Sequence, residues 1–111
     1  MSDALARGLT EAGEAAGEQM WRMPLHAPYA ALIESEVADQ SNAATKAGAG
    51  AGAITAALFL QRFVGSTPWA HLDIAGPMNV DADDGVYSKG ATGFGTRLLI
   101  DLACNFTPPN T

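Results

Sequence analysis

Apolar and polar positions near the start of the chain alternate with the period of an α-helix. The predicted helix runs from Ala4 to about Glu18, and Asp3 is its expected N-cap. Its apolar stripe consists of Leu5, Leu9, Ala12, Ala16 and Met20, and its polar face of Arg7, Glu11, Glu14 and Glu18. Gly8, Gly13 and Gly17 each cost about 1 kcal/mol relative to alanine inside a helix. We therefore expect this helix to depend on packing against a neighbour.

The strongest apolar signal lies between residues 53 and 75. Ala53–Val64 is apolar on more than one face, which is typical of a helix covered on both sides, and Gly65 is its expected stop. Trp69–Ala75 contains neither glycine nor proline and ends at a Gly-Pro break. That pattern predicts a buried strand followed by a functional loop. A buried helix that leads into a buried strand indicates α/β layering.

The remaining segments give weaker signals. Pro28 is expected to open a short helix that reaches Ile33, and residues 37–42 are ambiguous between a short strand and an edge segment. Residues 79–89 are acidic and polar, which favours an exposed loop. A last helix is expected, with Thr92 as its N-cap and with Pro108 and Pro109 ending it. Its predicted buried face consists of Leu99, Leu102, Ala103 and Phe106.

Length, charge and cysteine content narrow the class of protein. A chain of 111 residues has room for one domain. The net charge of −6, without a basic cluster, makes nucleic acid and anionic membranes poor partners. A run of about 18 apolar residues and a basic-then-apolar leader are both missing from the sequence, so we expect no membrane partner. The single Cys104 excludes an intrachain disulfide, fits a reducing compartment and is expected to be a small buried hydrophobe. We therefore expect a cytoplasmic protein, with Trp21 and Trp69 as packing anchors.

Two loops invite ligand interpretations that their spacing does not support. Gly48, Gly50 and Gly52 precede a helix, but they follow the order G-x-G-x-G and not G-x-G-x-x-G, and the segment before them is a weak strand. Close helix packing or a flexible loop is the alternative to nucleotide binding. Asp81, Asp83, Asp84 and Gly85 resemble part of a calcium loop. Counted from Asp81, however, an EF-hand requires glycine at the sixth position and glutamate at the twelfth, and neither is there.

His71 and Asp73 stand two residues apart and so face the same side of the predicted strand. Such a pair either orients a general base or forms a buried hydrogen bond that satisfies two polar groups. With Asp39, they are also the candidate metal ligands near predicted strands, but their spacing matches no metal site. The residues alone therefore predict no catalytic constellation.

Several words of the sequence resemble, in order, the C-terminal end of the leucyl (cytosol) aminopeptidase family. They are DALARGLTEAGEAAGEQMWRMPL from Asp3, ADQSN from Ala38, GAITAALFLQRFV from Gly52, WAHLDIAGP from Trp69 and GATGFGTRLL from Gly90. The resemblance implies an α/β fold: a C-terminal fragment of a three-layer α/β/α sandwich with a mixed sheet, mostly helical, with two to three short strands. Residues 1–111 would form a partial catalytic domain without a separate second domain. The stretch AGAG from Ala47 departs from the family by lengthening the lead into the helix.

Members of this family are hexameric enzymes that remove N-terminal residues from peptides with two divalent metals, zinc or manganese. The family word NTDAEGRL, which supplies several metal ligands, has no counterpart here, and neither has the earlier segment that provides Lys and Asp. The resemblance therefore assigns no catalytic residue and no metal ligand to this chain, and we expect the chain alone to bind no metal and to be inactive. In the complete enzyme it implies peptide as substrate and a homohexamer as assembly.

What the resemblance does assign is part of the pocket for the side chain of the substrate's N-terminal residue. The family's pocket positions correspond to Ala75 and Met78, where a small residue leaves room and a flexible thioether adapts to varied apolar groups. The match begins almost at Met1, so we expect Met1 to be an internal methionine or the chain to be a fragment. The alternative function is a non-enzymatic remnant that binds aminopeptidase subunits or other partners. In either case we expect marginal stability or self-association.

Overall fold

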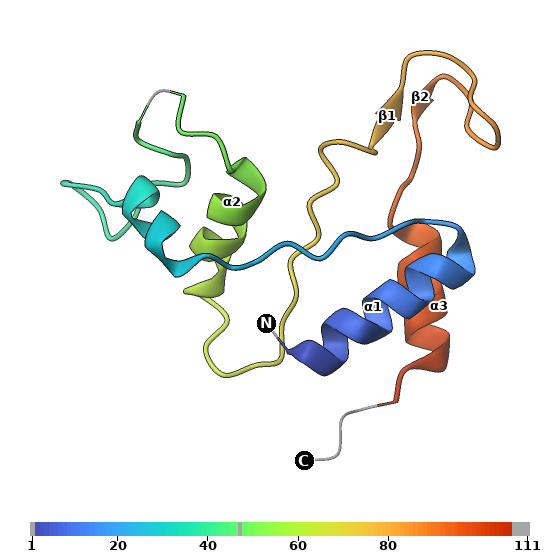
Figure 1. The fold of residues 1–111 in the computed structure, drawn as a ribbon, viewed down its shortest axis with the longest axis horizontal. Helices are drawn as coiled ribbons and strands as arrows, with labels where there is room; N and C mark the ends of the chain where they lie inside the picture. The colour runs from blue at the N-terminus through green and yellow to red at the C-terminus, as the bar shows by residue number, and fades with distance from the viewer. Residues whose placement is uncertain (1, 47, 108–111) are drawn as a thin grey trace. The chain divides into compact units, whose positions relative to one another are not determined.

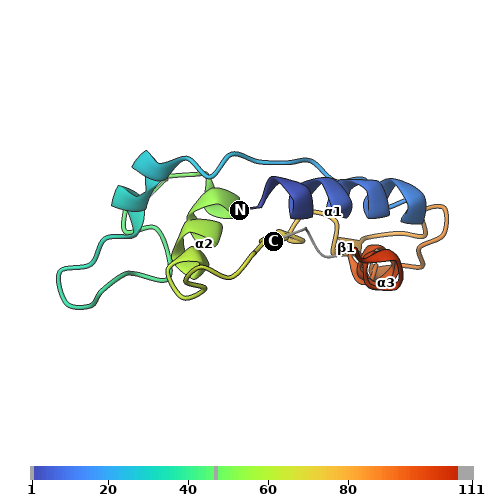
Figure 2. The same ribbon diagram turned by 90° about the horizontal axis from the view of Figure 1, so that it is seen from below.

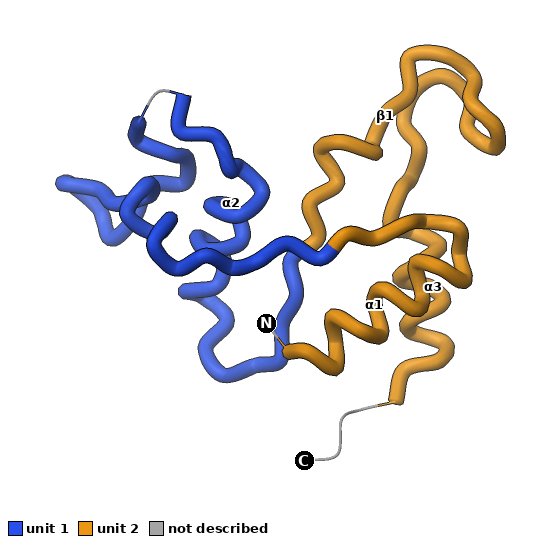
Figure 3. Tube along the Cα trace, viewed as in Figure 1, with its two compact units in different colours: residues 1, 22–71 blue, residues 2–21, 72–111 orange. Residues whose placement is uncertain are grey.

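The computed structural model describes residues 2–46 and 48–107, whose helices and short strands are drawn in Figure 1. These residues divide into two compact units, coloured separately in Figure 3. Unit 1 is a continuous segment, residues 22–71, whereas unit 2 combines residues 2–21 with the segment that begins at residue 72. Of the expected features, Ala47, Pro108 and Pro109 lie outside the described residues. No helix in the described part of the chain is long and apolar enough to cross a membrane.

Helix α1 of unit 2 spans Asp3–Ala16. Its N-cap is Ser2 and not Asp3, because the Ser2 hydroxyl accepts a hydrogen bond from the Leu5 amide at 3.4 Å. Asp3 instead lies in the first turn, where a carboxylate interacts favourably with the helix dipole. The buried side of the helix includes Leu9 and Ala12, as the periodicity predicts.

A Schellman motif ends α1 earlier than the sequence pattern predicts. Gly17 adopts the left-handed conformation with φ at 69°, which glycine enters without steric cost. The Gly17 amide donates to the carbonyl of Glu14 at 3.3 Å, and the Glu18 amide donates to the carbonyl of Gly13 at 2.8 Å. The chain therefore turns back over the last turn of the helix, and Glu18 is its first residue beyond that turn.

Helix α3 spans Thr96–Asn105 and packs against α1 within unit 2. Figures 1 and 2 show that the two helices cross and do not run alongside each other over their full lengths. The crossing is tightest at Gly13, where Leu98 reaches within 3.2 Å of where a β-carbon would stand; at Gly8, Leu102 lies 3.4 Å from that point, an ordinary contact distance. Leu98 is completely buried, and its position fixes α3 against α1.

A short β-hairpin completes unit 2. Strand β1 (Asn79–Val80) pairs antiparallel with β2 (Gly90–Ala91), with Asn79 opposite Ala91. Between the strands, Asp84 and Tyr87 exchange two backbone hydrogen bonds around a tight turn. The predicted exposed loop is therefore a hairpin whose side chains remain mostly exposed.

Unit 1 contains the 3₁₀ helix η1 (Ala27–Ile33) and helix α2 (Gly52–Gln61), which pack on each other. Proline stands in the first turn of η1, as expected from a ring that fixes φ and lacks an N–H donor. The core consists of Ile33, Ile54 and Leu58, with Leu25 and Phe59 packed against it. The ambiguous segment 37–42 forms bends and contains no strand.

The predicted buried strand at Trp69–Ala75 is wrong for the described structure. Residues 69–74 form neither helix nor strand, a turn covers residues 75–78, and Asp73 and Ile74 are exposed. A strand forms where a neighbouring backbone supplies hydrogen-bond partners, and no described segment does so here.

Three further predictions about burial are also wrong. The face of α3 predicted to be buried leaves Leu99, Ala103 and Phe106 exposed, because Leu98 is the residue that faces α1. Cys104 is exposed on the same helix. Trp21, an expected packing anchor, is 84% exposed, whereas Trp69 is half-buried.

Candidate functional site

The segment that holds the predicted pocket residues is a turn fixed by its own hydrogen bonds. The carboxylate of Asp73 accepts a bond from the Ala75 amide at 2.9 Å. The carbonyl of Ile74 accepts one from the Met78 amide at 3.0 Å, which closes a single helical turn around Gly76 and Pro77. The side chains of Ala75 and Met78 are both exposed, so the backbone is bonded while these two side chains stay free for contact.

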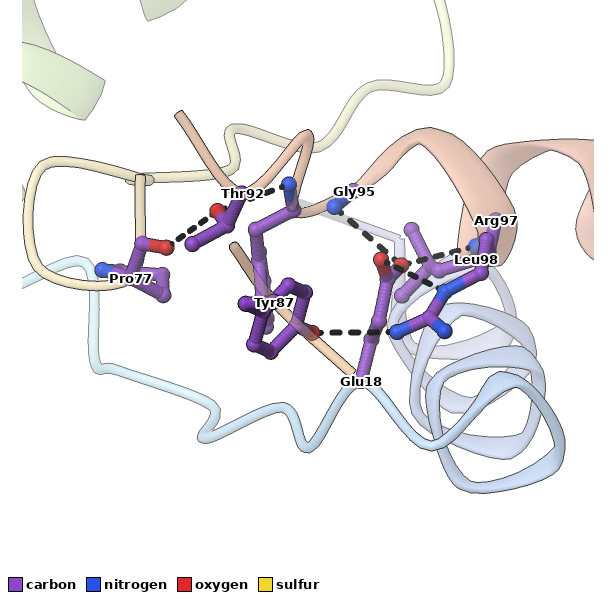
Figure 4. A network of polar contacts seen from close by, with 8 residues as sticks. Glu18, Pro77, Tyr87, Thr92, Gly95, Arg97 and Leu98 are labelled. Atoms are coloured by element: carbon purple, nitrogen blue, oxygen red, sulfur yellow. Dashed lines mark hydrogen bonds and ion pairs between the residues drawn. The ribbon is translucent and has the colours of Figure 1, made fainter. Parts of the chain in front are cut away.

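Thr92 ties this turn to the start of the last helical segment. Its hydroxyl donates to the carbonyl of Pro77, and its amide donates to the carbonyl of Met78 at 3.0 Å. The same hydroxyl accepts a bond from the Phe94 amide at 3.2 Å. Figure 4 shows Thr92 pointing at Pro77 across the base of the hairpin. The prediction that Thr92 caps the helix is therefore wrong: Gly95 is the N-cap, and Thr92 bonds the turn at residues 73–78.

A buried carboxylate occupies the N-terminus of α3. Glu18 is 1% exposed, and its Oε2 accepts hydrogen bonds from the amides of Gly95 at 3.2 Å and Leu98 at 2.9 Å. Its Oε1 faces the Arg97 guanidinium, 3.4 Å from Nε. Gly95 has no side chain with which to cap the helix, so a residue from the end of α1 satisfies these amides instead. The negative charge also complements the dipole at this helix end.

Arg97 extends the network to the hairpin. Its Nη2 donates to the hydroxyl of Tyr87 at 3.0 Å, and its guanidinium carbon lies 5.8 Å from the centre of the Tyr87 ring. Arg97 therefore links the buried Glu18 to a side chain of the hairpin loop (Figure 4). A planar guanidinium suits this arrangement, since it bonds in one plane and stacks on an aromatic ring.

The glycine loop before α2 and the acidic loop of the hairpin have geometries that do not match a nucleotide or calcium site in the described residues. Gly48, Gly50 and Ala51 all adopt positive φ, and no strand precedes them in the described part of unit 1, so the loop lacks the strand–loop–helix geometry of a nucleotide cradle. In the acidic loop, the Asp83 carboxylate accepts a hydrogen bond from the Lys89 amide at 2.8 Å and so stabilises the hairpin.

The strand on which His71 and Asp73 are expected to share a face does not form in the described structure. Asp73 serves the turn before Ala75, and the His71 ring lies 6.3 Å from that of Trp69. Within residues 2–46 and 48–107, no three side chains of His, Cys, Asp or Glu converge well enough to hold a metal ion. The donor set that a divalent metal requires is therefore not offered by the described residues.

Sequence reasoning missed Glu18, Arg97 and Tyr87. Glu18 sits at a polar position of the predicted helix, and its partners lie 77 to 80 residues away. A local pattern does not report a contact of that range. The one usable signal was a glycine at the N-cap of α3, which leaves helix amides without a local acceptor.

Comparison with known proteins places this geometry in a family. The model of the cytosol aminopeptidase family, catalytic domain, matches residues 1–100. The probable cytosol aminopeptidase of Roseiflexus castenholzii is 54% identical over 106 residues, which cover 95% of this chain and 21% of that protein. Among solved structures, a mutant of tomato leucine aminopeptidase aligns with a TM-score of 0.74 and 44% identity, covering 90% of this chain and 18% of that one. The bottromycin maturation enzyme BotP in complex with Mn aligns with a TM-score of 0.80 and 43% identity, covering 90% and 22%.

These matches show that the chain is part of a domain with the α/β fold of the aminopeptidases, as the sequence predicts. The chain belongs to the cytosol aminopeptidase family and corresponds to a C-terminal part of its catalytic domain. It spans about a fifth of the length of the curated relatives it matches.

Proposed function

We propose that this chain supplies part of the substrate side-chain pocket of a metal-dependent aminopeptidase. Ala75 and Met78 would contact the side chain of the N-terminal residue that is released. The observation that carries the proposal is the contrast within this turn: its backbone is held by Asp73, Ile74 and Thr92, yet both side chains are exposed. Rigid backbone with free apolar side chains is what a preformed binding surface requires.

The hydrolytic step belongs, in this proposal, to the complete enzyme. Two divalent metals, manganese or zinc, would polarise the scissile carbonyl there and activate water. The manganese complex of BotP supports manganese as one candidate. Because the sequence has no counterpart of the family's metal-ligand segments, this chain alone is proposed to bind no such metal and to be inactive.

The same proposal extends to the setting of the protein. The names of the relatives, cytosol aminopeptidases, support a cytoplasmic enzyme that acts on peptides. By family resemblance the complete enzyme would be a homohexamer.

A chimera tests the pocket. Residues 2–107 replace the matching segment of a full-length family enzyme, and kcat/KM is measured for leucyl and glycyl p-nitroanilides. Ala75→Leu fills the space that a small residue leaves, so we expect kcat/KM for the leucyl substrate to fall by about 10-fold to 100-fold. The glycyl substrate, which places no side chain in the pocket, should lose much less.

Ala82→Leu is the matched control, because Ala82 is an exposed alanine of the hairpin loop. It should leave kcat/KM unchanged for both substrates. Equal losses for both substrates with Ala75→Leu, or no loss for either, would contradict a pocket role.

The second candidate function is an interaction module, a remnant that binds aminopeptidase subunits or other partners. Several exposed apolar side chains favour it, among them Trp21, Val37 and Phe63. Co-elution of the 111-residue chain with an intact family enzyme would support this function, and separate elution would count against it.

A further inference from the structure

We propose that Glu18 is a positioning residue for the turn at residues 73–78, called here the pocket turn. It acts through the first turn of α3 and through Thr92. This inference rests on the proposed function, since it gives Ala75 and Met78 a reason to be held in place. Glu18 touches neither of them. Its effect would be transmitted by a continuous series of hydrogen bonds within unit 2.

The first step of the series is the remote cap. Gly95 and Leu98 are the N-cap and third residues of α3, and both amides are buried and bonded to one oxygen of Glu18. A capping side chain normally comes from the N-cap residue itself. Here the end of α1 supplies it, and the Schellman motif before Glu18 sets where its backbone lies. The direction of the first turn of α3 is therefore fixed by α1.

The second step leads from α3 to Thr92. The Thr96 amide donates to the carbonyl of Gly93 at 3.0 Å, and the Phe94 amide donates to the hydroxyl of Thr92. The residues between Thr92 and the helix are thus bonded at each turn. Displacing the start of α3 must displace or break these bonds.

The third step leads from Thr92 to the pocket turn. Two consecutive carbonyls, those of Pro77 and Met78, each accept a hydrogen bond from Thr92. The Met78 carbonyl belongs to a pocket residue, and the Pro77 carbonyl to the residue before it. Arg97 adds a parallel link, because it joins Glu18 to Tyr87 in the hairpin that begins directly after Met78.

The rival interpretation is that Glu18 is a helix cap with no wider effect. Both interpretations predict that the amides of Gly95 and Leu98 depend on Glu18. They differ at Thr92 and Phe94, whose amides bond other acceptors and would respond only if the position of the α3 terminus is transmitted.

Amide hydrogen exchange on the ¹⁵N-labelled 111-residue chain separates the two. Glu18→Gln keeps the size of the side chain but turns an NH₂ group toward Arg97 or toward the helix amides. We expect the Gly95 and Leu98 amides to exchange about tenfold faster or more, and those of Thr92 and Phe94 to accelerate with them. The Leu9 amide in the middle of α1 should be unchanged.

Glu14→Gln is the matched control, since Glu14 is an exposed glutamate of α1 and the substitution removes the same charge. It should leave all four amides unchanged. Acceleration at Gly95 and Leu98 without any at Thr92 and Phe94 would overturn the positioning role and leave a cap alone. If Glu18→Gln unfolds the chain, Glu18→Asp takes its place, because it retains the charge and shortens the reach by one methylene.

A pair of Thr92 variants tests the last link. Thr92→Val keeps the shape and removes the hydroxyl, so the Phe94 amide and the Met78 amide of the pocket turn should exchange faster while Gly95 and Leu98 remain protected. Thr92→Ser restores the hydroxyl and should restore protection. An unchanged Met78 amide in Thr92→Val would overturn the link.

Failure of the positioning role and failure of the proposed function give different results. If exchange couples Glu18 to Thr92 but Ala75→Leu does not discriminate leucyl from glycyl substrates, the pocket assignment fails and the coupling stands. If Ala75→Leu discriminates between the substrates but Glu18→Gln leaves exchange of the Thr92 amide unchanged, the pocket assignment stands and the coupling fails.

Discussion

The constraint on Gly13 comes from the turn that follows α1 and not from the helix itself. A β-carbon built there would lie 2.5 Å from the carbonyl oxygen of Glu18 and 2.8 Å from the Met20 side chain. The first distance is to backbone, which cannot rotate away. Glycine at this position is therefore what allows the Schellman motif to bring Glu18 back over the helix.

Gly13→Ala should destabilise unit 2 despite the higher helix propensity of alanine. The gain of about 1 kcal/mol in propensity is smaller than the cost of about 1–3 kcal/mol for forcing a methyl group into a packed site. A net loss, measured as the free energy of unfolding in urea, is the expected result.

Gly8→Ala is the control for that substitution. Its β-carbon would stand 3.4 Å from Leu102, which is ordinary contact, so the propensity gain of about 1 kcal/mol should appear as added stability. Destabilisation of similar size by both substitutions would contradict the role given to Gly13.

At the scale of elements, α3 shows why an apolar pattern can choose the wrong face. Leu98, Leu99, Ile100 and Leu102 give the helix apolar residues on several sides. Periodicity alone does not decide between neighbouring stripes in such a helix. The close crossing with α1 at Gly8 and Gly13 decides it in favour of Leu98 and Leu102.

Leu98→Ala should therefore be far more costly than Leu99→Ala. Leu98 is 0% exposed, and truncation of a buried leucine costs about 2–5 kcal/mol. Leu99 is 49% exposed, and its truncation should cost less than about 1 kcal/mol. Thermal unfolding followed by circular dichroism ranks the two, and a larger loss for Leu99→Ala would restore the face predicted from the sequence.

The elements divide into those that local sequence determines and those that it does not. The three α-helices were predictable, within a few residues at each end, because each is a run of ten or more residues with helical periodicity or continuous apolar character. The strand at residues 69–75 was not, since a strand depends on a neighbouring backbone and no described segment pairs with these residues. The sequence pattern does not predict the hairpin, because strands of two residues are too short to show alternation.

The candidate site divides in the same way. The sequence motifs that begin at Trp69 and Gly90 indicate the pocket turn, and the structure shows that Thr92 joins these two segments. The dependence of both on Glu18 was not visible, because it rests on a tertiary contact between distant parts of the sequence.

At the scale of the whole molecule, several large apolar side chains of the described residues are exposed. Leu99 and Ile100 are exposed on α3, and Phe106 is exposed at its C-cap. The net charge of −6 opposes association. We expect the sedimentation coefficient to rise with protein concentration, as the sequence analysis anticipates.

Ile100→Glu should weaken this self-association by placing a charge among these exposed apolar side chains. Ser88→Glu adds the same charge at an exposed residue of the hairpin loop and should have a much smaller effect. A sharp two-state melt of a strictly monomeric wild-type chain would contradict the expectation.

The discontinuity of unit 2 has a consequence for how the protein is made. During translation α1 and Glu18 leave the ribosome long before Gly95 and Leu98 are synthesised, since these partners of Glu18 follow it by 77 and 80 residues. At about 5–20 residues per second, the nascent helix waits several seconds for these partners. Unit 1 is encoded within that interval and has a continuous sequence, so it can fold first. A ribosome stalled on residues 1–94 followed by a linker long enough to fill its exit tunnel should therefore carry a folded unit 1 and a protease-sensitive α1.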